Sequence, residues 1–219
     1  MSLRVLERKV AALGFSSIAG VDEAGRGPLA GPVVASSVIL PLSGEIEGIA
    51  DSKSLTMQQR ECLYNKITKE ARAYGIGMTN AAQIDKINIL QATFSAMKAA
   101  IKHLPMRPDF VLVDGKAPIP DLEIEQLAEI KGDKHCYCIA AASILAKVTR
   151  DRIMLKMHEK FPCYNFAKHK GYGTAEHLDA LKRYGPCPIH RKSFKGVREL
   201  CQKQELLSAN GEKKKLLNI

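Results

Sequence analysis

Two adjacent acids, Asp22 and Glu23, follow a short apolar run over residues 18–21. The run has the composition of a strand, and a turn rich in glycine and proline comes directly after the acids. Because neighbouring side chains of a strand point to opposite faces, we expect the two acids to share a site only where the strand ends. Paired carboxylates there are typical ligands of a hard divalent cation, although such a pair alone is more often a solvated turn.

The glycines of the same turn, Gly25, Gly27 and Gly31, raise a second hypothesis, a dinucleotide-binding loop. That fingerprint requires a helix directly after the glycines. Residues 33–40 are instead rich in β-branched side chains, which predicts a second strand. The dinucleotide interpretation is therefore poor.

Two further acids repeat the opening arrangement. Asp114 ends the apolar run 110–114, and Asp133 follows an expected strand over residues 125–130. In sheets that alternate with helices, ligands gather beyond the strand ends. Three acid-tipped strands are harder to attribute to coincidence than one, so the pattern favours a shared metal site.

Positive charge is concentrated in one part of the chain. The net charge is +10, and residues 131–198 alone carry 15 Lys and Arg against 5 Asp and Glu. A concentrated basic face indicates a polyanionic partner, most simply nucleic acid, against the alternative of a solvated basic surface. Within an expected helix over residues 139–160, Lys147 and Arg150 share one face and are candidates to contact phosphate, or else form a solvated stripe.

A basic loop at residues 168–174 holds one aromatic residue, Tyr172, between two glycines. A core tyrosine normally has apolar neighbours in the sequence. We therefore expect Tyr172 to be exposed and available to stack on a sugar or base.

The elements that must position these residues alternate between strand and helix, which predicts an α/β domain with a central sheet. The expected strands are residues 18–21, 33–40, 73–79, 110–114 and 125–130. The expected helices are residues 2–12, 54–72, 81–86, 89–103, 139–160, 176–184 and 194–207, with Ser54 beginning the second of them.

The 219 residues suffice for one well-cored domain, and no apolar stretch approaches the length of a membrane span. Without a signal-peptide core, a cytoplasmic location is expected. The six cysteines are then expected to be reduced thiols. The segment from His135 to Cys138 contains two of them, but its one-residue gap and the lack of a second pair argue against zinc.

Taken together, these stretches resemble the bacterial ribonuclease HII family. The resemblance covers residues 17 to about 200 and lies in six stretches: 20–32 (GVDEAGRGPLAGP), 51–55 (DSKSL), 113–115 (VDG), 131–133 (KGD), 141–151 (AASILAKVTRD) and 169–172 (HKGY). Ribonuclease HIII shares much of the pattern but carries an extra N-terminal domain, whereas about sixteen residues precede the first strand here.

The resemblance implies a ribonuclease H-like fold: a central mixed five-stranded sheet flanked by helices, with a helical C-terminal extension. It divides the chain into a lead-in helix (residues 1–13), the catalytic domain (14–200) and a tail (201–219). The implied activity is endonucleolytic cutting of RNA–DNA hybrids and of duplex DNA 5′ to single embedded ribonucleotides, leaving 3′-OH and 5′-phosphate ends. A monomer is expected.

Carried over by position, the family's acids, which are both catalytic and metal-binding, are Asp22, Glu23, Asp114 and Asp133. The turn that senses the ribose 2′-hydroxyl is implied to be Gly25-Arg26-Gly27, and the tyrosine that reads the RNA-to-DNA junction is implied to be Tyr172. We add Lys53, Lys147 and Arg150 as candidate phosphate contacts.

Phosphodiester hydrolysis needs an activated water and a neutralised leaving oxygen, which two divalent cations supply. The carboxylates suit Mg²⁺ or Mn²⁺. The alternatives are another nuclease of the same fold, such as a ribonuclease HIII or a junction-resolving enzyme, and a basic nucleic-acid-binding protein without catalysis. The last of these does not explain four acids set against a surface for polyanions.

Overall fold

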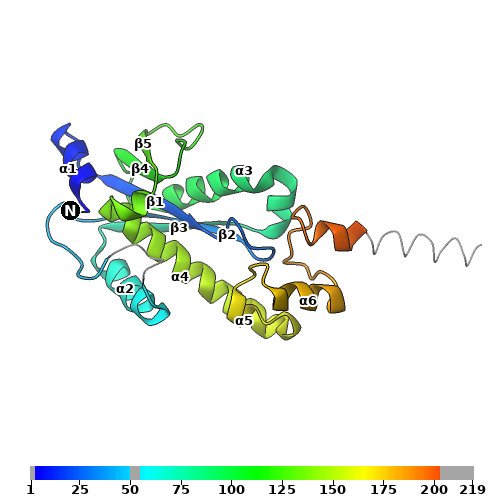
Figure 1. Ribbon diagram of the computed structural model, residues 1–219. Helices are drawn as coiled ribbons and strands as arrows, with labels where there is room; N and C mark the ends of the chain where they lie inside the picture. The colour runs from blue at the N-terminus through cyan, green and yellow to red at the C-terminus, as the bar shows by residue number, and fades with distance from the viewer. Residues whose placement is uncertain (1–2, 50–54, 203–219) are drawn as a thin grey trace, which may run out of the picture.

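A computed structural model of the chain describes residues 3–49 and 55–202 (Figure 1). In chain order its elements are α1 (Val5–Ala12), β1 (Ile18–Ala24), β2 (Val33–Ile39), α2 (Met57–Glu70), β3 (Ala73–Thr79), α3 (Ala81–Lys102), β4 (Phe110–Asp114), β5 (Glu125–Glu129), η1 (Gly132–Lys134), α4 (Tyr137–Lys160), η2 (Pro162–Tyr164), α5 (Phe166–His169) and α6 (Ala175–Tyr184).

The five strands form one mixed sheet in the order β3-β2-β1-β4-β5, which confirms the predicted architecture. β2 pairs antiparallel with both β1 and β3. β4 pairs parallel with β1 on one side and with β5 on the other. β1 is central, with neighbours on both edges, and its first five residues are buried. This is why the run 18–21 is apolar without alternation.

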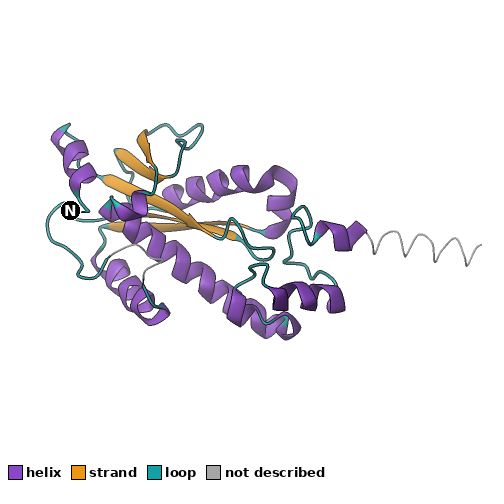
Figure 2. Cartoon of the chain, viewed as in Figure 1, coloured by secondary structure: helices purple, strands orange, loops and turns teal. Residues whose placement is uncertain are grey.

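Helices cover both faces of the sheet (Figure 2). α3 packs on β3 and β2, and α4 packs on β1 and β2 from the opposite side. The close approach depends on glycine: a Cβ at Gly20 would lie 2.2 Å from the backbone of Cys138 in α4, and one at Gly77 would lie 2.1 Å from the carbonyl of Ala96 in α3. Gly75 and Gly77, the two glycines of β3, are therefore positions where the strand packs closely against α3.

The two predicted helices over residues 81–103 are confirmed as the two halves of α3, which is kinked at Asn88. This residue has a positive φ of 66°. Its side-chain oxygen accepts the backbone N–H groups of Leu90 (2.9 Å) and Gln91 (3.1 Å). Asn88 thus caps the second half as an N-cap residue would.

Several predicted boundaries are wrong. β1 continues through both acids to Ala24 rather than ending at Val21. The N-cap of α2 is Thr56, which forms a capping box with Gln59, whereas Ser54 lies outside the described residues. Of the helix predicted over 194–207, residues 194–197 form turns and 198–202 are helical; the rest of the predicted tail also lies outside the described residues.

The segment after α4 packs as a small second core. Its buried members include Phe166, Leu181 and Val197, and they surround Met154 near the end of α4. An isolated bridge between Ala30 and His190 joins this core to the turn that follows β1. No helix within the described ranges combines the length and the apolar composition that a bilayer span requires.

Candidate active site

Three of the four predicted acids meet at one end of the central strands. β1 and β4 run parallel with Val21 opposite Val113, so Asp22 and Asp114 follow the same register position. They border a cavity of about 310 Å³. Its lining residues are Asp22, Glu23, Ala24, Gly25, Arg26, Gly27, Arg60, Asp114, Ser143, Lys147 and Tyr172.

The two neighbouring acids of β1 line the same cavity although the strand does not end there. Pairing with β2 continues to Ala24, but pairing with β4 stops at Val21. The edge of β1 next to β4 is therefore open at Asp22 and Glu23. The expectation that the strand must end at the acids is wrong for the β2 edge and holds for the β4 edge.

Burial and mutual repulsion perturb these carboxylates. Asp22 is 5% exposed, and burial raises its pKa well above the ordinary value, with Glu23 and Asp114 raising it further. Burial also raises the pKa of Glu23, although Arg26, at 3.3 Å from its Oε1, opposes the shift. Buried like charges of this kind are stabilised when cations lie between them.

The fourth acid, Asp133, is placed differently. It lies in η1 and is 2% exposed, and it does not line the cavity. Its neighbour Gly132 donates its backbone N–H to Oδ1 of Asp114 at 2.7 Å. The structure thus gathers three acids around the cavity and buries the fourth next to the residue that holds Asp114.

The glycine–arginine–glycine turn borders the same cavity, and its two glycines differ. Gly25 has a φ of +96°, and a Cβ there would lie 2.0 Å from Nε of Arg150. Gly27 has an ordinary φ, and a Cβ there would meet only Cε1 of Tyr172, at 3.8 Å. Protein packing therefore explains Gly25 but not Gly27, whose lack of a side chain leaves open space beside Tyr172.

A buried guanidinium holds this turn from inside. Arg191 is 0% exposed and donates to the carbonyls of Gly25 (2.5 Å), Arg26 (2.9 Å) and Gly31 (3.0 Å). Burial, followed by the nearby charge of Arg150, lowers its pKa to about 9. Arg191 was not predicted from the sequence, because nothing local distinguishes it from the other cations of the basic segment.

Arg150 is the second buried arginine of this region. Only 1% of it is exposed, and it donates to the carbonyls of Pro32 (3.0 Å) and Ala30 (3.1 Å). The expectation that Arg150 shares an exposed face with Lys147 is therefore wrong. Its guanidinium is buried and bound to two backbone carbonyls of the protein.

Tyr172 is 46% exposed, as predicted, and its ring centroid lies 5.9 Å from Cζ of Arg150. Its carbonyl is bound by Nδ1 of His177 at 2.9 Å. The other ring nitrogen of His177 lies 3.0 Å from Nε2 of His190, whose Nδ1 accepts the backbone N–H of Cys187 at 2.9 Å. This chain is satisfied when both imidazoles are neutral and each donates once.

A third imidazole, that of His169, stacks on His177 at 4.5 Å between ring centroids. Its Nε2 donates to the carbonyl of Tyr164 (2.7 Å), and its Nδ1 accepts the N–H of Gly171 (3.2 Å). Burial lowers the pKa of all three histidines, that of His190 to about 4. This histidine cluster, which was not predicted from the sequence, fixes the loop that carries Tyr172.

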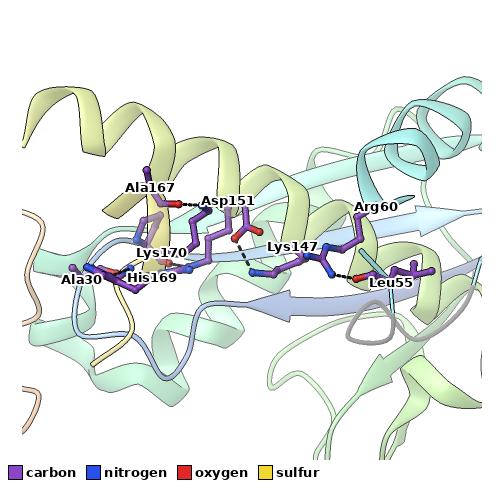
Figure 3. A network of polar contacts seen from close by, with 11 residues as sticks. Ala30, Leu55, Arg60, Lys147, Asp151, Ala167, His169 and Lys170 are labelled. Atoms are coloured by element: carbon purple, nitrogen blue, oxygen red, sulfur yellow. Dashed lines mark hydrogen bonds and ion pairs between the residues drawn. The ribbon is translucent and has the colours of Figure 1, made fainter. Parts of the chain in front are cut away.

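Two cationic side chains besides Arg26 line the cavity. Nζ of Lys147 lies 2.7 Å from Oδ1 of Asp151. Arg60 of α2 also lines the cavity, and its guanidinium donates to the carbonyl of Leu55 (Figure 3). Arg60 was missed because it follows the pattern of an ordinary exposed helix position. Lys53, the third candidate phosphate contact, lies outside the described residues.

The chain is similar in sequence to known proteins that belong to one family. The sequence profile of the family described as Ribonuclease HII matches residues 19–197. A ribonuclease HII from Geobacter metallireducens is 54% identical over 198 residues, covering 90% of this chain and 92% of that protein.

Two solved structures share the fold. The ribonuclease H2 from Pyrococcus horikoshii OT3 is 30% identical with a TM-score of 0.71, and the match covers 85% of this chain and 98% of that one. The RNase HII solved with PCNA from Archaeoglobus fulgidus is 27% identical with a TM-score of 0.69, covering 82% and 95% respectively.

Proposed function

The chain belongs to the ribonuclease HII family and is a hydrolase, an endonuclease of RNA–DNA hybrids, and we propose that it also cuts duplex DNA 5′ to single embedded ribonucleotides. The proposed products carry 3′-OH and 5′-phosphate ends. We include in this proposal that the protein acts as a monomer in the cytoplasm.

Asp22, Glu23 and Asp114, together with Asp133, are the residues that would hold two divalent cations. Their oxygen atoms suit Mg²⁺ or Mn²⁺, and the raised pKa of Asp22 and of Glu23 reflects buried charges that a cation would compensate. When bound, the cations supply an activated water and neutralise charge on the leaving oxygen. Gly132 keeps Asp114 oriented through its N–H.

The turn is proposed to recognise the 2′-hydroxyl through its backbone. Arg191 binds the carbonyls of Gly25 and Arg26. Because C=O and N–H point in opposite directions across a trans peptide, the N–H groups of Arg26 and Gly27 point away from Arg191. Both residues line the cavity, so their backbone can approach a ribose bound there.

Tyr172 is proposed to read the junction by stacking on the sugar that follows the ribonucleotide. A deoxyribose fits against the ring, whereas the 2′-oxygen of a ribose would crowd it. The open space beside Gly27 supports a sugar at this position. Lys147 remains a proposed phosphate contact together with Lys53, and Arg60 is added because it borders the cavity.

The observation that carries this proposal is a single cavity bounded by three acids, the glycine–arginine–glycine turn and an exposed tyrosine. The test is a cleavage assay with a labelled DNA duplex carrying one ribonucleotide, with Mg²⁺ or Mn²⁺ and then with EDTA. An all-DNA duplex and a four-way DNA junction serve as controls. We expect one metal-dependent cut 5′ to the ribonucleotide and none in the controls.

Two results would contradict the proposal. Cutting of the four-way junction in preference to the ribonucleotide duplex would indicate a junction-resolving nuclease of the same fold. Equal binding of hybrids in EDTA with release of intact strands under all conditions would indicate a binding protein.

A further inference from the structure

A second group of potential metal ligands lies apart from the cavity. Glu7 of α1 meets Cys136 and Cys138 at the start of α4, and one ligand atom from each lies within 4.8 Å of the others. The three residues are 5%, 0% and 2% exposed. Within the described part of the chain, no other three His, Cys, Asp or Glu residues come this close together.

The carboxylate of this group is only half satisfied. Oε1 of Glu7 accepts the backbone N–H of Cys138 at 2.8 Å. Oε2 is buried and has no hydrogen-bond partner among the described residues. The surroundings are apolar and include Val10, Ile18 and Phe110. A buried oxygen left without a partner is destabilising, so packing alone does not account for an acid here.

The sulfur atoms are spaced as ligands of one ion would be. Sγ of Cys136 and Sγ of Cys138 are 3.6 Å apart. Two thiolates at about 2.3 Å from a tetrahedral zinc ion are separated by roughly 3.8 Å. A hydrogen bond between two thiols gives a similar separation, but it does not call for a third residue with an unpartnered carboxylate oxygen.

The position at a helix terminus favours negative ligands. Cys136 is the N-cap of the 24-residue helix α4, and the positive end of its dipole faces the group.

We propose that Glu7, Cys136 and Cys138 form a three-ligand site for one thiophilic divalent cation, for which zinc is the reference ion. The expectation from the sequence argued against zinc at these cysteines, because the sequence does not show that Glu7 lies beside them as a third ligand. Sulfur ligands distinguish this site from the all-oxygen site at the cavity. The ion would tie α1 to the segment before α4. That segment adjoins the active site, because the N–H of Cys136 donates to the carbonyl of Gly132 at 2.8 Å and Gly132 holds Asp114.

The test is titration of the reduced, full-length protein with Co²⁺ in excess Mg²⁺. A thiolate-to-cobalt charge-transfer band in the near ultraviolet reports sulfur ligation, which carboxylates do not produce. We expect the band to saturate at one Co²⁺ per chain and to disappear when Zn²⁺ is added. Absence of the band in the reduced protein would overturn the proposal.

Variants identify the ligands. The C136S/C138S variant should lose the band, whereas C62S/C163S, which removes two exposed cysteines, should keep it. Persistence of the band in C136S/C138S would overturn the proposal.

If circular dichroism shows that C136S/C138S does not fold, the E7Q variant tests the site instead. It retains an oxygen for the N–H of Cys138 but removes the charge, and we expect Co²⁺ affinity to fall at least about tenfold. Unchanged Co²⁺ affinity in E7Q would show that Glu7 is not a ligand and would also overturn the site.

Discussion

Two buried clusters of like charge border the glycine–arginine–glycine turn: the acids Asp22, Glu23 and Asp114, and the arginines Arg150 and Arg191. Burial shifts the pKa values of the two clusters in opposite directions. In the acid cluster, burial raises the pKa of Asp22 well above its ordinary value. In the arginine cluster, burial lowers the pKa of Arg191 to about 9 and also lowers that of Arg150. The same desolvation thus disfavours the charged form in both.

The clusters differ in what compensates them. Arg150 and Arg191 bind carbonyl groups of the turn that follows β1, so fixed protein dipoles satisfy them. The acids instead have one another as neighbours, and the hydrogen bonds from Ser143 to Asp22 and from Arg26 to Glu23 do not offset the rise in their pKa values. The arginine cluster is therefore satisfied within the protein and serves the fold, whereas the acid cluster is proposed to bind cations and to serve the chemistry.

The largest effect is expected on activity in the acid cluster. D114N removes a charge that is proposed to bind metal but keeps an oxygen for the N–H of Gly132, so the fold should persist. We expect cleavage of the ribonucleotide duplex to fall by more than about 10³-fold, measured under single turnover with Mg²⁺. D121N, which alters an acid whose side chain is 91% exposed, is the matched control and should cut normally. A folded D114N protein with wild-type activity would falsify the metal-binding role proposed for Asp114 in the acid cluster.

The next effect is expected on stability in the arginine cluster. R191M leaves three backbone carbonyls without their donor, which should lower the free energy of unfolding by about 3 kcal/mol in urea. R198M, on a side chain that is 56% exposed, should change it by less than about 0.5 kcal/mol. Equal stability of the two variants would mean that Arg191 does not hold the turn.

A pH dependence is expected from the histidines behind the turn. The folded-state pKa of His190 is about 4 and its ordinary value is 6.5, so its neutral form stabilises the fold above pH 6.5. His190 thereby contributes about 3 kcal/mol to the free energy of unfolding, and this contribution is lost as the pH falls from 6.5 to about 4. Asp22 and Glu23 act in the opposite sense, because their raised pKa values favour the folded state at low pH.

The contribution of His190 is isolated by comparing urea unfolding of wild type and H190Q between pH 7 and 4.5. The wild type should lose more stability over this range than H190Q. The exposed His103 is the control, and H103Q should follow the wild type. Parallel curves for wild type and H190Q would contradict the neutral chain of imidazoles.

A smaller effect is expected at Tyr172, which lines the cavity beside the glycine–arginine–glycine turn. Y172A should reduce cleavage at a single ribonucleotide about tenfold more than cleavage of a long RNA–DNA hybrid, because stacking on the following sugar is lost. Y184A removes another exposed ring and should affect both substrates little. Equal losses on the two substrates in Y172A would argue against junction reading.

The smallest effect is expected at the rim. K147A should weaken binding to all sequences alike and lower the slope of log affinity against log salt by about one. The control is K102A, on a lysine of α3 that does not line the cavity. A slope unchanged from wild type would remove Lys147 from the phosphate contacts.

The amino-acid sequence by itself determined the features that depend on local pattern. Local residue composition located all five strands, and the acids that follow the apolar runs 18–21 and 110–113 placed Asp22, Glu23 and Asp114 at one edge of a sheet. The polar, glycine-flanked setting of Tyr172 predicted its exposure. Strand periodicity and turn composition are patterns over a few neighbouring residues, so they can be recognised from the sequence alone.

Only the tertiary structure decided which charges are buried and what satisfies them. Arg150 has the helical spacing of an exposed cation, yet its acceptor Pro32 lies 118 positions away along the chain. Glu7 likewise reaches Cys138 across 131 positions. Contacts of this range depend on how the sheet and its helices pack, because the order of residues along a helix does not specify which distant carbonyl or thiol will lie beside it.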